Sequence, residues 1–309
     1  MRVLVTGATG FLGRNLTHAL SMNGHRVTGV GSRDCNLLRP ESLHKFRETF
    51  DQIWHLAAWT QAGDFCLHHP GEQWIINQHI NTNVLDWWQS RQPQAKLIAI
   101  GTSCSYAPGS DLMEENYLNG DPVPELYAYA MTKRMLLVGL KALSAQYGLE
   151  YLYLIPSTLY GAGYHAGGKQ RHFIFDLIEK IVRGKQLGEP VHLWGDGNQK
   201  RELIFVSDFV NAALQLADRF HNEVVNIGSS AEYSIRWYAE KICRLVDYDP
   251  AKIEYDTSRY TGVRSKQLCI RKLKTLLPEF EMTPIDDALE MTVEWFQESQ
   301  QLALDAKCR

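Results

Sequence analysis

The chain has few cysteines, and they follow no regular spacing. Its 309 residues include six, none of them in a CxxC pair or a zinc-finger pattern: Cys35, Cys66, Cys104, Cys243, Cys269 and Cys308. A disulfide framework is therefore not expected, and no metal site is predicted.

Long apolar runs, a basic leader and a strong net charge are lacking too. No run of about 18 apolar residues occurs, so we expect no membrane-spanning helix. The opening residues MRVLV form a strand pattern rather than a signal peptide. A formal net charge of −3 gives no reason to expect nucleic acid or an anionic membrane as a partner. Together these absences favour a protein of the reducing cytoplasm.

Apolar residues nevertheless make up 45% of the chain, enough for a large core. In the first half, strands are expected at 2–6, 25–31, 52–58, 95–101 and 150–155. Helices are expected up to residue 23 and at 40–50, 72–90 and 127–148. The alternation predicts right-handed βαβ units and hence an α/β, Rossmann-like, doubly wound parallel sheet.

The second half is less regular. Helices are expected at 173–183, 234–247 and 286–304, and strands at 203–209 and 224–228. We predict a cofactor-binding Rossmann domain over 1–160, to which segments near 203–230 return. Residues 161–309 are expected to form a smaller, interleaved substrate-binding lobe.

A glycine-rich loop lies between the first predicted strand and helix. Gly7, Gly10 and Gly13 form the pattern GxxGxxG. The first glycine permits a tight turn, and the others allow close backbone approach while the helix N-terminus faces a pyrophosphate. A plain strand–helix turn is the alternative, but the context favours a dinucleotide site.

The residues after the second predicted strand bear on which dinucleotide is bound. Arg33 suits a 2′-phosphate and favours NADP(H) over NAD(H). Asp34, which follows it, could instead take a ribose hydroxyl, as in NAD enzymes. Arg33 could also be only an exposed surface charge.

Tyr129 and Lys133 lie four residues apart, on one face of a predicted helix. An ammonium group beside a phenol lowers the phenol pKa from its usual value of about 10. The phenol could then exchange a proton with a substrate oxygen near neutral pH. Behind a nucleotide-binding loop, this pair predicts hydride transfer.

These motifs together resemble the extended short-chain dehydrogenase/reductases that act on nucleotide sugars, and within them the GDP-L-fucose synthase group of epimerase–reductases. The resemblance runs from about residue 2 to residue 230. Beyond the motifs above, it is carried by these segments: His55-Leu56-Ala57-Ala58, Gly101 to Tyr106, Arg33-Asp34-x-Asn36-Leu37-Leu38, Asn77 with Asn83, Leu159-Tyr160-Gly161, and Trp194-Gly195-x-Gly197 ahead of Arg201-Glu202.

The resemblance implies a set of cofactor-binding residues: Gly7, Gly10, Phe11, Leu12, Gly13, Arg33, Asn36, Leu37, Leu56, Ala57, Ala58, Asn77, Tyr129, Lys133 and Pro156. It also implies that Thr102 polarises the substrate oxygen, that Tyr129 is the proton donor and that Lys133 is its electrostatic partner. Ser103 is a rival for the role of Thr102, whose hydroxyl could instead only cap the next turn.

Cys104 and His172 match the positions that serve this group as acid and base in epimerisation. A 4-ketone acidifies the C3 and C5 protons, so a base on one face and an acid on the other can invert a centre. We expect Lys133 to stabilise the Cys104 thiolate. The alternatives are that Cys104 is a buried small hydrophobe and that His172 is only a surface residue.

Substrate contacts are implied for Ser103, Thr158, Lys169, Trp194 and Arg201, the last as a guanidinium clamp on the pyrophosphate. The predicted function is an NADP(H)-dependent epimerase/reductase of a nucleotide-linked 4-keto-6-deoxy sugar, with GDP favoured. A nucleotide-sugar 4-epimerase and a 4-ketoreductase without epimerase activity are the alternatives. Thr158 and Phe205 depart from the residues usual in the group and leave the sugar open. Thr9 stands where the group often has an Arg near the 2′-phosphate, which argues against NADP(H).

The helices predicted at 72–90 and 127–148 lie where this family pairs its subunits through a four-helix bundle. We therefore expect a homodimer. Trp87 and Trp88 are adjacent and point to different faces, so we expect one in the core and the other at the interface.

Overall fold

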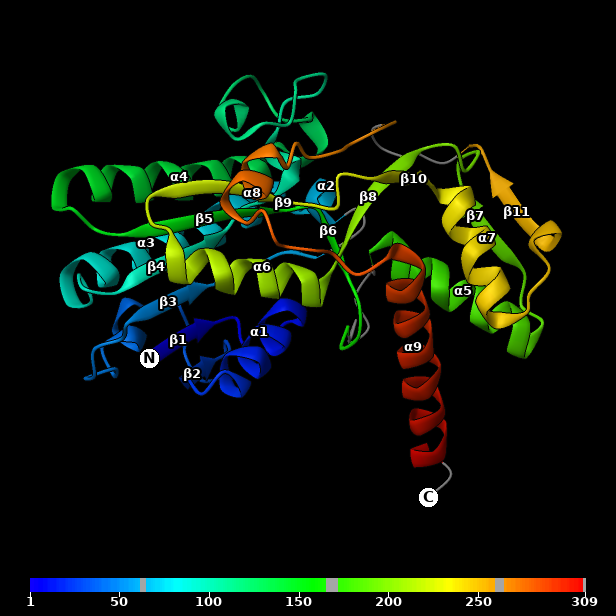
Figure 1. Ribbon diagram of the computed structural model, residues 1–309, viewed down its shortest axis with the longest axis horizontal. Helices are drawn as coiled ribbons and strands as arrows, with labels where there is room; N and C mark the ends of the chain where they lie inside the picture. The colour runs from blue at the N-terminus through cyan, green and yellow to red at the C-terminus, as the bar shows by residue number, and fades with distance from the viewer. Residues whose placement is uncertain (62–64, 165–171, 259–263, 308–309) are drawn as a thin grey trace.

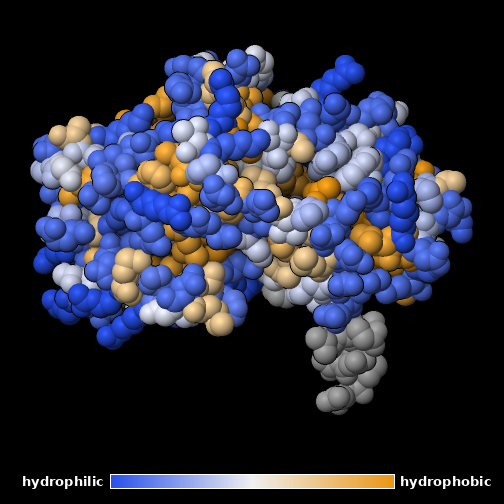
Figure 2. Space-filling view, viewed as in Figure 1, coloured by the Kyte–Doolittle hydropathy of each residue, from blue (hydrophilic) through white to orange (hydrophobic). Residues whose placement is uncertain are grey.

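The computed structural model describes residues 1–61, 65–164, 172–258 and 264–307, with side chains described up to residue 299. Two lobes lie side by side, a larger one around a wide sheet and a smaller one around α5, α7 and α9 (Figure 1). Hydrophilic residues predominate on the face shown in Figure 2, with hydrophobic residues in small groups over both lobes.

The larger lobe contains a six-stranded sheet in the order β2-β1-β3-β4-β5-β9. All its pairings are parallel. The strands are β1 (Arg2–Thr6), β2 (Arg26–Val30), β3 (Gln52–His55), β4 (Lys96–Ile100), β5 (Tyr151–Pro156) and β9 (Glu223–Ile227). Most of their side chains are buried, which explains why the strands read as apolar runs rather than alternating ones. The predicted Rossmann-like parallel sheet is confirmed.

Helices pack in pairs against this sheet. α1 (Phe11–Met22) packs against α6 (Val206–Arg219), and α3 (Pro70–Arg91) packs against α4 (Tyr127–Tyr147). One pair covers each face of the sheet (Figure 1). The chain order reverses at β1, whose neighbours β2 and β3 lie on either side of it. A sheet of this kind binds its ligand in the crevice at this switch point.

The smaller lobe has its own core. β6 (Thr158–Tyr160), β8 (Lys200–Phe205) and β10 (Glu232–Ser234) form one small sheet, and β7 (Val191–Trp194) pairs with β11 (Ile253–Asp256). Around them pack α5 (Phe173–Leu187), α7 (Ile235–Val246) and α9 (Ile285–Lys307). Between β11 and α9 the chain returns to the larger lobe, where α8 (Arg271–Leu276) packs against β9.

Two predicted elements differ from the structure. The predicted strand 203–209 ends at Phe205, and Val206 begins α6, because an unbroken apolar run fits a buried helix as well as a strand. The predicted helix 40–50 is only a 3₁₀ turn over Pro40–Leu43; beyond it, Phe46 and Phe50 turn inward and pack on Trp87.

The prediction that one of Trp87 and Trp88 lies in the core and the other at the subunit interface is wrong. Both are buried within the protomer, with 2% and 0% of their surface exposed. Trp88 donates its indole N–H to the Ala95 carbonyl at 2.8 Å. Among the described residues, no helix is both long and apolar enough to cross a membrane.

Candidate active site

The glycine loop leaves no room for side chains where a dinucleotide would lie. A Cβ on Gly13 would stand 2.2 Å from the Gly7 carbonyl oxygen, and one on Gly7 would stand 2.8 Å from the Ala57 amide nitrogen. Gly7 has φ of +69°, which glycine adopts without strain. Gly10 is the N-cap of α1 and has no side chain to occupy the first amides of the helix. The cradle therefore fits a pyrophosphate.

Residues after β3 form the other wall of this crevice. Leu56 and Ala57 contact Gly7, and the Ala57 N–H donates to the Thr6 hydroxyl at 3.3 Å. Phe11, on the first turn of α1, contacts the cores of both lobes. The switch point thus coincides with the junction of the lobes.

Asp34 is engaged by its own loop. Its carboxylate accepts the Gly31 N–H at 3.1 Å. Arg33 is exposed beside it. This arrangement leaves the guanidinium of Arg33 as the group available to a 2′-phosphate and favours NADP(H).

Two of the other predicted cofactor residues, Asn77 and Asn36, have hydrogen-bond partners within the protein, and four more are buried or partly buried. Asn77 is buried and holds the Trp59 backbone, accepting its N–H at 2.9 Å and donating to its carbonyl at 3.0 Å. Asn36 accepts the Leu38 N–H at 3.1 Å, and Leu37 lies in the core. Leu12 and Ala58 are partly buried, and Pro156 is the buried end of β5.

A buried polar chain runs beneath the predicted catalytic helix. His55 Nδ1 lies 3.0 Å from the Thr6 hydroxyl, and its Nε2 lies 3.1 Å from the Asn81 side-chain oxygen. Asn81 donates to the Thr132 carbonyl on α4. Burial lowers the pKa of His55 to about 4, so its ring is neutral at physiological pH. His55 was predicted only as part of its motif, and Asn81 was not predicted.

Lys133 and Tyr129 lie on α4, as predicted, but the electrostatics differ from the expectation. Lys133 is buried and donates to the Ile100 carbonyl at 2.8 Å. Burial lowers its pKa to about 8. The pKa of Tyr129 is raised rather than lowered, first by burial and then by nearby Cys104. The expected lowering of the Tyr129 pKa by Lys133 is wrong, because burial is the largest cause of the shift and it raises the pKa.

Thr102 has one of the two roles considered for it, that of capping the next turn. Its hydroxyl accepts the Cys104 N–H at 3.2 Å and so caps the 3₁₀ turn η2 (Ser103–Ser105). It also lies near Tyr129, where it opposes the rise in the Tyr129 pKa. Thr102, Cys104 and Tyr129 therefore form one cluster. Ser103 is buried next to them.

The cation beside Cys104 is Lys266, not the expected Lys133. Lys266 Nζ donates to Cys104 Sγ at 3.1 Å. Burial raises the pKa of the thiol, but the charge and hydrogen bond of Lys266, together with Thr102 and Arg201, outweigh it, and the net shift is downward. Lys266 was not predicted, because it lies 162 positions from Cys104 and outside the motifs.

Arg134, next to Lys133, is another residue that the motifs did not identify. It is buried and donates to backbone carbonyls on both sides of the active-site loop, including those of Ser105, Asn119 and Gly120. Through these bonds it fixes the segment that carries Thr102 and Cys104.

The predicted substrate residues lie along the smaller lobe. Arg201, on β8, is close enough to Cys104 to lower the pKa of the thiol. Thr158 begins β6, and Trp194 ends β7 with 53% of its surface exposed. His172 is the N-cap of α5, accessible to solvent, and its described contacts are with Tyr164. Lys169 lies outside the described residues.

No group of three or more His, Cys, Asp or Glu side chains in the described part of the chain could hold a metal ion. The five cysteines described there are all free.

Comparisons with known proteins agree on one family. A sequence profile of the NAD dependent epimerase/dehydratase family matches residues 3–228. The GDP-L-fucose synthase of Escherichia coli (strain K12) is 26% identical over 320 residues, covering 97% of each chain. The GDP-L-colitose synthase of Yersinia pseudotuberculosis is 26% identical over 310 residues, covering 96% of this chain and 98% of that protein.

Solved structures show the same fold. A GDP-L-fucose synthetase from Naegleria fowleri, bound to NADP, has a TM-score of 0.86 at 24% identity and covers 97% of this chain and 93% of that one. A UDP-glucose 4-epimerase from Thermotoga maritima, with UDP-glucose, has a TM-score of 0.84 at 23% identity, covering 97% of this chain and all of the other.

Proposed function

The chain belongs to the NAD dependent epimerase/dehydratase family, and from this premise we propose that it is an NADP(H)-dependent epimerase–reductase of a GDP-linked 4-keto-6-deoxy sugar. The resemblance predicted from the sequence motifs is confirmed by the profile match. Relatives named as GDP-L-fucose and GDP-L-colitose synthases support the GDP-linked substrate. The free guanidinium of Arg33 and a relative's NADP-bound structure support NADP(H).

One observation carries the proposal: Tyr129 and Thr102 lie together beside Cys104, whose sulfur accepts a hydrogen bond from Lys266 and whose thiol pKa is lowered. The pair suits a ketone oxygen, and the thiol suits a carbon-bound proton next to it. A plain reductase needs only the pair. The two together fit an enzyme that both epimerises and reduces.

Each residue has a defined task in this scheme. Cys104, as a thiolate, takes a proton from a carbon beside the ketone; the C–H bond breaks, the S–H bond forms, and the electron pair moves to the ketone oxygen. Thr102 and Tyr129 hold that oxygen. His172 is proposed to return a proton from the opposite face.

Bound NADPH would supply the hydride that reduces the ketone. The loop of Gly7, Gly10 and Gly13 would hold its pyrophosphate. Tyr129 donates the proton that the former ketone oxygen takes up, and Lys133 fixes the ribose. We propose that Arg201 binds the substrate diphosphate and that Trp194 contacts the sugar or base.

The test is incubation with GDP-4-keto-6-deoxymannose and NADPH in deuterated water, with NADPH oxidation followed by absorbance and the product by NMR. We expect NADPH consumption and deuterium at C3 or C5. Tyr129→Phe should lower the oxidation rate by about 100-fold or more and leave NADPH binding intact. Cys104→Ser should reduce deuterium incorporation more than reduction.

Two results would count against the scheme. Reduction without deuterium in the wild-type product would favour a 4-ketoreductase that lacks epimerase activity. Unchanged turnover of the Tyr129→Phe variant would remove the proton donor from the proposal.

We further propose a homodimer formed through the paired helices α3 and α4. Large apolar side chains remain exposed on both, with Ile75 at 56% and Val138 at 41%. Because Trp87 and Trp88 are buried, these side chains, with Trp74 and Met135, are the candidates for the four-helix contact. A cytoplasmic location is also proposed, from the use of NADPH and the free thiols.

A further inference from the structure

We propose that Lys266 is the positioning residue that keeps the Cys104 sulfur as a thiolate, and that Glu202 and Glu232 hold Lys266 in place. The inference deepens the proposed function and rests on the acid–base role given there to Cys104. It concerns a segment, residues 265–268, that lies beyond the family match at 3–228.

The first support is the direct contact. Lys266 Nζ lies 3.1 Å from Cys104 Sγ, and the lysine is half-buried. A second hydrogen bond fixes the backbone of the cysteine, because the Cys104 N–H donates to the Thr102 hydroxyl oxygen at 3.2 Å. The hydrogen bond of the Cys104 N–H thus orients the cysteine, and the Lys266 ammonium group contacts its sulfur.

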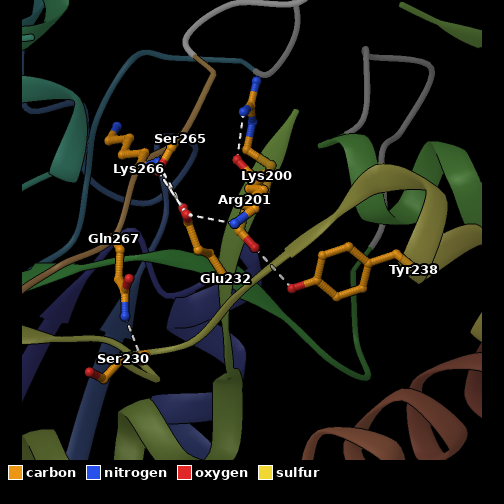
Figure 3. A network of polar contacts seen from close by, with 8 residues as sticks. All are labelled: Lys200, Arg201, Ser230, Glu232, Tyr238, Ser265, Lys266 and Gln267. Atoms are coloured by element: carbon orange, nitrogen blue, oxygen red, sulfur yellow. Dashed lines mark hydrogen bonds and ion pairs between the residues drawn. The ribbon is translucent and has the colours of Figure 1, made fainter. Parts of the chain in front are cut away.

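The second support is the anchoring of residues 265 and 266 by Glu232 (Figure 3). The two carboxylate oxygens of Glu232 lie 2.7 and 2.8 Å from the Ser265 hydroxyl, and one accepts the Lys266 N–H at 3.0 Å. Lys200 stands 3.8 Å from the same carboxylate. Glu232 therefore holds the backbone of Lys266 and leaves its side chain to Cys104.

The third support is Glu202, which anchors the other end of the segment. Its carboxylate accepts the Leu268 N–H and the Ser230 N–H, each at 2.8 Å. It is 4% exposed, and a Cβ on Gly228 would stand 2.4 Å from it, so glycine is needed to admit this carboxylate. Glu202 and Glu232 are directly paired across β8 and β10. Neighbouring carboxylates thus fix the backbone on both sides of Lys266.

The charges around the sulfur favour the ionised thiol. Lys266 and Arg201, from β8, are cationic, whereas Tyr129, from α4, and Cys66, from α2 (Phe65–His68), are neutral near pH 7. The pKa of Cys66 is raised by burial. Of these groups, within the part of the chain that the structure describes, only Lys266 donates a hydrogen bond to the Cys104 sulfur. When the thiolate takes a proton from the substrate carbon, Lys266 keeps its own protons.

The experiment measures thiol ionisation without any substrate. The intact protein is alkylated with iodoacetamide over a pH series, and modification of the Cys104 peptide is timed by mass spectrometry. In Lys266→Met the apparent pKa of Cys104 should rise by about one unit, so the rate near pH 7 should fall roughly ten-fold. Lys266→Arg should restore most of the rate. Lys200→Met, which alters the same carboxylate cluster but not the sulfur contact, is the matched control and should alkylate like wild type.

A second readout separates positioning from folding. With GDP-4-keto-6-deoxymannose, Lys266→Met should lose deuterium incorporation at C3 or C5 while the thermal midpoint stays that of Lys200→Met. Equal alkylation profiles for wild type and Lys266→Met would overturn the inference, as would failure of Lys266→Arg to recover. If wild type does not turn over this sugar but its alkylation still depends on Lys266, the substrate assignment fails and the Lys266–Cys104 inference stands.

Discussion

At the scale of single residues, two buried titratable groups have opposite effects on how the stability of the protein depends on pH. His55 is 1% exposed, and its pKa is lowered from 6.5 to about 4 by burial. Glu202 is 4% exposed, and burial raises its pKa from 4.5 to about 7. Because the pKa of His55 is lowered in the folded state, this residue destabilises the protein as pH falls from about 6.5 to 4. Because the pKa of Glu202 is raised in the folded state, its contribution to stability is lost as pH rises from about 4.5 to 7.

The first prediction follows from this opposition. Between pH 5 and pH 7 each group changes the free energy of unfolding by about 2 kcal/mol, with opposite sign, so their effects nearly cancel in the wild type. Glu202→Gln leaves His55 unopposed, and stability should rise more steeply with pH. His55→Gln should do the reverse. Urea unfolding at the two pH values measures this, and parallel pH responses of all three proteins would contradict it.

Cofactor choice also rests on one side chain. Arg33→Ala should raise the KM for NADPH by about ten-fold and leave the KM for NADH almost unchanged, because only a 2′-phosphate pairs with the guanidinium. Asp34 is not a substitute, since its carboxylate is bonded to the Gly31 N–H. Steady-state kinetics with both cofactors gives the answer, and an equal effect on the two would remove the preference for NADP(H).

At the scale of elements, the close packing of α1 on the loop after β1 requires glycine at position 13, because no space is left there for a side chain. A Cβ on Gly13 would meet the Gly7 carbonyl at 2.2 Å, so Gly13→Ala must push the helix away from the loop. We expect a loss of about 1–3 kcal/mol in stability and at least roughly ten-fold weaker NADPH binding. Gly71→Ala, on α3, has open space and is the control. Fluorescence titration and thermal unfolding test both effects; wild-type binding by Gly13→Ala would contradict this role of the loop.

Helices and strands could be predicted from the sequence wherever the hydrophobic pattern and the residues that end an element agreed. The strands of the large sheet, α1, α3 and α4 follow from apolar runs separated by glycine and polar turns, and the glycine loop follows from its position between two of them. The start of α6 did not follow, because Val206 continues the apolar run of β8 without a break. Local pattern cannot distinguish a buried strand from a buried helix.

Residues of the candidate active site could be predicted only where they belong to a short sequence motif. Thr102, Tyr129 and Lys133 come from short contiguous patterns, and the structure places Thr102 near Tyr129. Lys266 could not be found in this way, because its approach to Cys104 depends on how two strands and a distant segment meet. The direction of the Tyr129 pKa shift was predicted wrongly, because burial, its largest cause, cannot be seen in the sequence.

At the scale of the whole molecule, the proposed dimer makes a direct prediction. Met135 and Val138 lie exposed on α4, next to α3. Val138→Glu would bury a charge at the proposed interface, so the dimer should weaken by at least roughly ten-fold in dissociation constant. Leu187→Glu, on the exposed end of α5, is the matched control. Sedimentation velocity over a concentration series distinguishes them, and a wild-type monomer at all concentrations would rule the dimer out.

The interleaving of the lobes bears on how the chain folds as it leaves the ribosome. β5 ends at Pro156, but its partner strand β9 begins only at Glu223. The helix α8, which packs against β9, begins only at Arg271. At about 5–20 residues per second, the nascent sheet waits several seconds with the edge of β5 unpaired. Exposed strand edges recruit other chains. Translation speed over the stretch between these strands should therefore govern how much of the protein escapes aggregation.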